Sequence, residues 1–139
     1  MKGPEIISQV KKLDLPADQY TVVGSGSLAV RGIREAADID LVITPDLYGS
    51  LKESGWEEER KLGSKPEWVI SSGPFDASTS WAVEGYEPTA LELIETSDVI
   101  DGVNFVNIPS LLAWKKAARR EKDLRDIQLI ETYLKTHNP

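Results

Sequence analysis

Residues 22–43 read VVGSGSLAVRGIREAADIDLVI, and they contain two features that together predict the fold. A short β-branched strand at residues 20–23 runs into the segment GSGS at residues 24–27, and a short helix is expected from Leu28 to Gly32. A second, buried strand is expected from Ile39 to Thr44. The local prediction is therefore strand, glycine loop, short helix and strand.

The glycine loop has the composition of a phosphate-binding turn. A helix that follows a strand and a Gly-Ser turn presents backbone N–H groups at its N-terminus, and such donors favour phosphate. Gly24 permits close approach of a ligand, and the hydroxyls of Ser25 and Ser27 can add hydrogen bonds. The alternative interpretation is an ordinary strand-to-helix turn in which a serine caps the helix. The loop alone does not decide between the two.

Two aspartates, Asp38 and Asp40, share one face of the second strand, because residues i and i+2 of a strand point to the same side. The two carboxylates of such a pair repel each other unless a cation lies between them. Mg²⁺ suits them, with triphosphate oxygens and waters completing its coordination. The alternative is a solvated edge strand with its charges outward. The apolar residues Ile39, Leu41 and Ile43 on the other face favour a central strand, and hence the metal site.

Together the loop and the aspartates resemble the signature of the nucleotidyltransferase superfamily, the DNA polymerase β-like enzymes. That signature is a hydrophobic residue, Gly, and Gly or Ser, followed after a spacer by Asp, a hydrophobic residue, Asp or Glu, and a hydrophobic residue. Here Val23-Gly24-Ser25, twelve intervening residues and Asp38-Ile39-Asp40-Leu41 satisfy it. The preceding Gly32-Ile33-Arg34 is similar to the AbiEii-like branch of minimal nucleotidyltransferases, which includes toxins.

The resemblance implies an α/β (α+β) nucleotidyltransferase fold: a short mixed twisted sheet carries the acids, helices pack on one side, and a long C-terminal helix closes over the nucleotide. It also implies a third acid on a neighbouring strand, which joins the metal site and acts as general base. Asp76 is the best candidate, with Glu67 and Glu84 as weaker alternatives. Asp76 is equally compatible with a turn after Gly73-Pro74.

A basic segment, WKKAARREKDLRD at residues 114–126, lies in the expected C-terminal helix, which is predicted from Pro109 or Ser110 to about Leu134. By spacing alone it is a solvated helix face. It also resembles the Lys…Arg-x-Lys-Asp-x-x-Asp helix of the AbiEii-like branch. That resemblance implies phosphate binding, most directly by Lys115, with two aspartates orienting the basic side chains. The matching positions are Lys115, Arg120, Lys122, Asp123 and Asp126.

The rest of the chain continues the alternation of helices and strands, and we expect a single domain over residues 1–139. Asp46 is expected to cap a helix that ends near Gly55. The tryptophans are interpreted mainly as core or rim residues, although Trp81 and Tyr86 could flank a base or an acceptor. Further helices are expected at Pro4–Leu13 and Leu91–Ile94, and further strands at Trp68–Ser71, Phe75–Thr79 and Val103–Val106.

The amino-acid composition excludes several kinds of site and of catalytic chemistry. The chain has no cysteine, which excludes disulfides, zinc–thiolate sites and a thiol nucleophile, and its single histidine, His137, lies near the end. Residues 1–12 lack the apolar core of a signal peptide and no apolar run is long enough to span a bilayer, so we expect a cytoplasmic protein without membrane contact. The net charge of −7 does not attract nucleic acid, so an RNA partner requires a local basic patch.

By resemblance the function is Mg²⁺-dependent transfer of a nucleoside monophosphate from a triphosphate such as ATP to an acceptor hydroxyl. Nothing in the sequence chooses among RNA, protein and small-molecule acceptors. An alternative from another class is a non-catalytic nucleotide- or partner-binding domain, such as a toxin–antitoxin component. A third hypothesis is a resistance-type enzyme that modifies an aminoglycoside-like or lincosamide-like molecule, because an acidic surface suits a cationic substrate.

Overall fold

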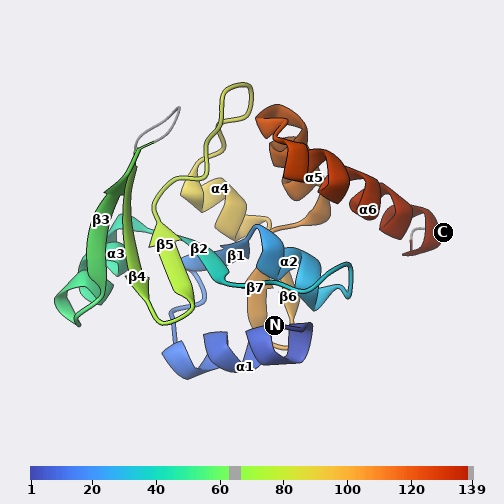
Figure 1. Ribbon diagram of the computed structural model, residues 1–139. Coiled ribbons are helices and arrows are strands. Elements are labelled where there is room, and N and C mark those ends of the chain that lie inside the picture. Colours follow the sequence, from blue (N-terminus) through green and yellow to red (C-terminus); the bar gives the residue numbers. More distant parts are fainter. Residues whose placement is uncertain (63–66, 138–139) are drawn as a thin grey trace.

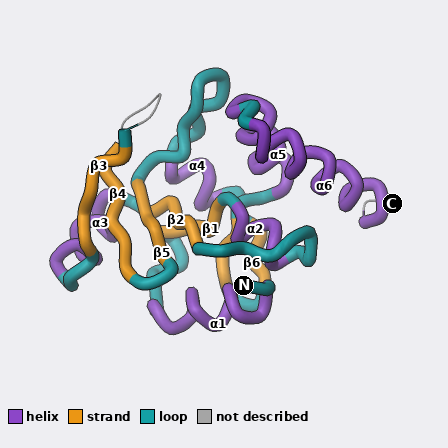
Figure 2. Tube along the Cα trace, viewed as in Figure 1, coloured by secondary structure: helices purple, strands orange, loops and turns teal. Residues whose placement is uncertain are grey.

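The computed structural model describes residues 1–62 and 67–137, which form one mixed sheet flanked by helices (Figures 1 and 2). No helix in these two ranges is long and apolar enough to cross a membrane. The helices are α1 (Gly3–Leu13), α2 (Ser25–Val30), α3 (Pro45–Glu53), α4 (Ala90–Glu95), α5 (Ile108–Ala118) and α6 (Glu121–His137). The strands are β1 (Tyr20–Val23), β2 (Ile39–Ile43), β3 (Glu57–Lys61), β4 (Glu67–Ser72), β5 (Phe75–Ser78), β6 (Asp98–Ile100) and β7 (Val103–Phe105).

The strand order places the quoted stretch at the centre of the sheet. The order is β3-β4-β5-β2-β1-β7-β6, so β1 and β2 are neighbours and both are interior strands. β2 runs antiparallel to β1 and parallel to β5, which makes the sheet mixed. The prediction of a central second strand is therefore confirmed, and β5 is the strand beside it.

Helices cover both faces of the sheet, so the expectation of helices on one side is wrong. Ile39, Leu41 and Ile43 pack in a cluster with α1 and α3. On the opposite face, Val23 and Val42 pack with α4, α5 and α6. The physical reason is that both faces of β1 and β2 are apolar along most of their length, and each face needs its own cover.

The two outer strands, β3 and β6, were not foreseen from the sequence. β3 reads EEERK and is largely exposed, as suits a charged edge strand that resists pairing with another chain. β6 is equally an edge strand and only three residues long. Neither has the apolar alternation that signals a half-buried strand. The cap of α3 also differs from expectation: the hydroxyl of Thr44, rather than Asp46, accepts the N–H of Leu47 at 3.3 Å.

The expected single helix from residue 109 or 110 to about 134 is instead two helices. α5 ends at Ala118, Arg119 adopts a left-handed conformation with φ of 52°, and α6 begins at Glu121. Lys115 and Lys122 therefore do not lie along one continuous helical face as predicted. The break allows the beginning of α6 to pack back against α5, while its C-terminal part extends away from the sheet (Figure 1).

Candidate active site

Three aspartates lie on or next to the neighbouring strands β2 and β5. Asp40 of β2 and Asp76 of β5 are register partners on adjacent parallel strands, and Asp38 immediately precedes β2. Neighbouring strands lie ~4.8 Å apart, and residues in register point to the same face. All three side chains line one cavity of about 530 Å³. Asp76 thus lies within a strand, as the third-acid hypothesis requires, and not in the turn after Gly73.

The carboxylates repel one another. Burial raises the pKa of Asp40 to about 6, and the negative charges of Asp38 and Asp76 add to this effect. Lys61 and Lys122 act in the opposite direction, and the Lys61 Nζ lies 3.8 Å from Asp76 Oδ2. The cluster is therefore short of positive charge when no cation is bound.

This donor set fits Mg²⁺. Mg²⁺ in enzymes is commonly bound by one or two carboxylates together with substrate phosphates and water, rather than by a complete cage of protein ligands. Among residues 1–62 and 67–137, no three His, Cys, Asp or Glu side chains are gathered closely enough to hold a metal ion by themselves.

Replacing Asp40 with asparagine is expected to stabilise the metal-free protein at pH 8. Because the pKa of Asp40 is raised from 3.8 to about 6 in the folded chain, stability is lost as the pH rises between these two values. A neutral amide avoids this cost, a gain of ~1–2 kcal/mol at pH 8 that disappears below pH ~4. Urea unfolding in EDTA at pH 8 and pH 4 measures it. Equal effects at both pH values would contradict the prediction.

The glycine loop lies directly against the acids. Gly24 follows β1 with φ of 66°, and a Cβ on it would lie 3.2 Å from Asp40 Oδ2. Both the backbone conformation and the close approach therefore favour glycine at this position. Gly24 and Ser25 line the cavity, and their contact with a triphosphate stays a prediction. Ser27 is placed differently: it is fully buried and its hydroxyl donates to the Val22 carbonyl at 2.8 Å. Its placement does not support the predicted contact with nucleotide.

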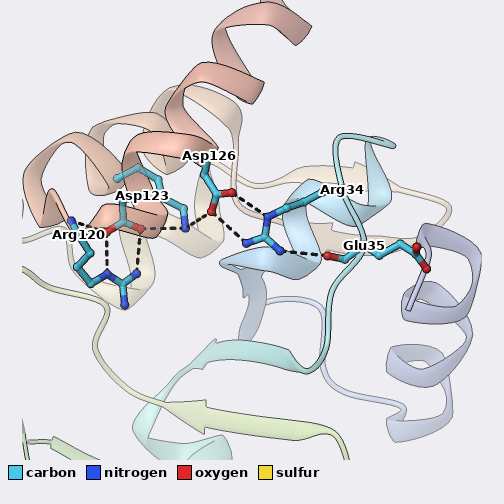
Figure 3. Close-up of polar contacts among 6 residues, drawn as sticks. Arg34, Glu35, Arg120, Asp123 and Asp126 are labelled. Atoms are coloured by element: carbon cyan, nitrogen blue, oxygen red, sulfur yellow. Dashed lines mark hydrogen bonds and ion pairs between the residues drawn. The ribbon is translucent and has the colours of Figure 1, made fainter.

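Three cations that line the cavity, Arg34, Lys115 and Arg120, belong to one ionic network, and Figure 3 shows its polar contacts. The side chain of Lys115 is 5% exposed, and its Nζ lies 3.2 Å from Asp123 Oδ1 and 3.0 Å from Asp126 Oδ2. Arg34 donates to both oxygens of Asp126 at 2.8 and 3.0 Å. Arg120 donates to both oxygens of Asp123 at 2.7 and 3.0 Å. The network thus joins the segment before β2 to both C-terminal helices.

The predicted cations all line the cavity, but they differ in how they are held. Lys115 is held between two carboxylates, whereas Arg120 and Lys122 are exposed on the same side. Burial alone would raise the pKa of Asp123 and Asp126. Hydrogen bonds from Arg120 and Arg34 and the charge of Lys115 outweigh burial and leave both pKa values lowered. Asp123 and Asp126 therefore remain ionised and contact the basic side chains of Arg34, Lys115 and Arg120; the phosphate-binding role that the resemblance implied stays a prediction.

Sequence reasoning missed several residues of the cavity. Arg34 lies in the quoted stretch, but its partner Asp126 is 92 positions away. Lys61 lies in the unpredicted strand β3. Trp114, which was assigned to the core or rim, also lines the cavity, as does Trp81, which had been named as able to flank a base or an acceptor. Glu67, a weaker candidate for the third acid, lies there too, and burial raises its pKa. Glu84, the other weak candidate, is not among the lining residues.

Comparison with known proteins identifies solved structures with a similar fold. No protein-family model and no curated protein matches the chain. Similar solved structures include two of the aminoglycoside nucleotidyltransferase ANT(2″)-Ia. A crystal structure in complex with adenylyl-2″-tobramycin has a TM-score of 0.53 and 19% identity, covering 93% of this chain and 85% of that one. A solution structure of the same antibiotic-resistance factor has a TM-score of 0.54 and 21% identity, covering 93% and 80%.

The chain has the nucleotidyltransferase fold. The prediction made from residues 22–43 is confirmed at this level. The nucleotidyltransferase fold also explains why a glycine loop and paired aspartates occur together: consecutive elements of one central unit, β1, α2 and β2, bring Gly24 against Asp40. The finer assignment to the AbiEii-like branch stays a prediction.

Proposed function

We propose that this protein transfers a nucleoside monophosphate from a nucleoside triphosphate to the hydroxyl of an acceptor, using Mg²⁺ held jointly by the phosphates of that substrate and by carboxylates of the cluster Asp38, Asp40 and Asp76. The proposal depends above all on one observation: Asp40 and Asp76 are in register on adjacent strands, beside Gly24, in a cavity that also contains the cations of α5 and α6. The shared fold with ANT(2″)-Ia supports it.

The triphosphate is assigned to the part of the cavity lined by Gly24, Ser25 and the helical cations. Backbone N–H groups at the beginning of a helix and nearby cations are the usual partners of phosphate. Arg120 and Lys122 are the exposed cations there, with Lys115 buried behind them. Mg²⁺, when bound, would neutralise phosphate charge and align the α-phosphate with the acceptor. This arrangement places negative phosphate on the cationic side and the reacting phosphorus toward the aspartates.

The transfer step requires one proton acceptor from the protein. The acceptor hydroxyl oxygen forms a bond to the α-phosphorus. The bond from the α-phosphorus to the oxygen that bridges it to the β-phosphorus breaks, and pyrophosphate leaves. Asp76 takes the proton from the hydroxyl, so the products are a phosphodiester that joins the nucleoside to the acceptor, pyrophosphate and a proton. Asp76 suits this role because it lies beside Asp40 and its side chain remains partly exposed.

Nucleotide binding is the first test of the proposal. We expect calorimetry to detect Mg²⁺-dependent binding of at least one of ATP, CTP, GTP and UTP by the wild type. The double variant Asp38→Asn/Asp40→Asn should lose this binding, because it removes the metal ligands while preserving side-chain size. Asp18→Asn, an exposed position outside the cavity, is the matched control and should bind normally. Failure of the wild type to bind any triphosphate would refute the proposal.

Transfer itself is tested by pyrophosphate release and by mass spectrometry of the acceptor. ATP and tobramycin are the first pair to try, because adenylyl-2″-tobramycin is the compound in one ANT(2″)-Ia structure. RNA and protein acceptors follow. The expected product carries one added nucleoside monophosphate. Nucleotide binding without transfer to any of these acceptors would instead favour the alternative function, a non-catalytic nucleotide-binding domain.

A further inference from the structure

Two indole rings stack in the cavity that contains the aspartates. Trp81 lies between β5 and α4, and Trp114 lies in α5. Their ring centroids are 4.9 Å apart and their planes differ by 3°, so their faces are parallel. Both side chains are half-buried and line the same cavity as Asp40 and Asp76. Aromatic surface is therefore available within reach of any ligand that occupies the cavity.

Core packing alone does not account for Trp114. Its Nε1 is buried and has no hydrogen-bond partner among the described residues. Buried indole N–H groups are normally paired, and a phenylalanine would fill apolar space without an unpaired donor. The Arg120 guanidinium carbon lies 5.0 Å from the Trp114 ring centroid, and the Lys115 Nζ lies 5.7 Å from it. The stack is thus continuous with the cationic side chains assigned to the triphosphate.

We infer that the stacked pair Trp81–Trp114 binds the nucleobase of the nucleoside triphosphate through the face of Trp81 that is turned away from Trp114, an inference that rests on the proposed function. The base is the aromatic part of that substrate, and indole faces bind bases by stacking. A cavity of about 530 Å³ is of the size that holds a small ligand. Stacking contacts the faces of a base rather than its hydrogen-bonding edges, so the pair selects for aromatic area. Purine triphosphates should consequently bind more tightly than pyrimidine triphosphates.

The experiment compares ATP with inorganic tripolyphosphate, which has the phosphates but no base. Affinities are measured by calorimetry in Mg²⁺ for the wild type, Trp81→Leu and Trp81→Phe. We expect Trp81→Leu to weaken ATP binding about tenfold, the lower part of the range for loss of one stacked base. Tripolyphosphate binding should be unchanged. Trp81→Phe retains a smaller aromatic face, so it should bind ATP with intermediate affinity and also reports on the site if the leucine variant fails to fold.

Trp68→Leu is the matched control. Trp68 is 56% exposed on β4, and its neighbours Glu67 and Val69 line the cavity, so Trp68 points to the opposite face of the sheet. It should bind ATP like the wild type. Unchanged ATP affinity in Trp81→Leu and Trp81→Phe, or an equal loss for ATP and tripolyphosphate, would overturn the base-binding role while leaving the proposed function standing. If the wild type binds neither ligand, the proposed function fails and this inference fails with it.

Discussion

Replacing Lys115 with methionine is expected to lower the free energy of unfolding by about 3 kcal/mol, because it removes one partner of a buried ionic network. The Lys115 ammonium lies within 3.2 Å of carboxylate oxygens of both Asp123 and Asp126, which are 0% and 3% exposed. Methionine preserves much of the side-chain volume but leaves these carboxylates with less positive charge. Domains of this kind are stable by only ~5–15 kcal/mol, so urea unfolding at pH 7 should show the effect plainly.

Lys116→Met is the matched control. Lys116 is the next residue on α5 and is exposed, so its replacement should change stability by less than ~0.5 kcal/mol. A similar loss in both variants would indicate that the network contributes nothing specific.

The same network predicts a shift in acid unfolding. The pKa values of Asp123 and Asp126 are lowered in the folded state, so their contribution to stability is present above the unfolded pKa and is lost as the pH falls through the folded values. Without Lys115, both folded pKa values should rise. The acid midpoint of Lys115→Met, followed by circular dichroism, should therefore lie at higher pH than that of the wild type. An unchanged midpoint would contradict the role assigned to Lys115.

The centre of the fold could be predicted because its signals are local. Alternation along β2 separates Ile39 and Leu41 from Asp40, and this same alternation separates the two packed clusters in the structure. Gly24 is required by a backbone angle and by the nearness of Asp40, because it connects β1 to α2 at the point where Val23 of β1 pairs with Asp40 of β2. A sequence records such short-range constraints directly.

What could not be predicted depends on distant pairings. The pair Arg34–Asp126 spans 92 positions, and the stack Trp81–Trp114 joins a loop to a helix. The helical spacing of the charged residues continues through Arg119, although this left-handed residue ends α5. The sequence therefore predicted one helix where the structure has two. Ser27 shows the converse error: its residue type suits phosphate, but its position on α2 directs its hydroxyl to the Val22 carbonyl. The sequence therefore indicated which chemistry each side chain could perform, but not which distant residues it would contact.

Replacing Asp76 with asparagine is expected to reduce kcat by ~10²–10⁴-fold while the protein still binds nucleoside triphosphate. The amide cannot take the proton of the acceptor hydroxyl, whereas Asp38 and Asp40 remain to bind Mg²⁺ with the phosphates. Asp76 is the register partner of Asp40, so the substitution acts next to the reacting groups without changing side-chain size. Single-turnover transfer and calorimetry, with the acceptor found in the transfer assay, separate the chemical step from binding.

Glu67→Gln is the variant to compare with Asp76→Asn, because Glu67 is the alternative candidate for the general base in the same cavity. Burial raises the pKa of Glu67, and the negative charge of Asp40 raises it further. Glu67 therefore lies close enough to interact electrostatically with the aspartates of the cavity. It begins β4, however, which pairs with β5 and lies one strand further from β2. Position therefore favours Asp76 as the base, and Glu67→Gln should reduce kcat by less than about tenfold. A larger loss in Glu67→Gln than in Asp76→Asn would transfer the role of general base to Glu67 and leave Asp76 as a metal ligand alone.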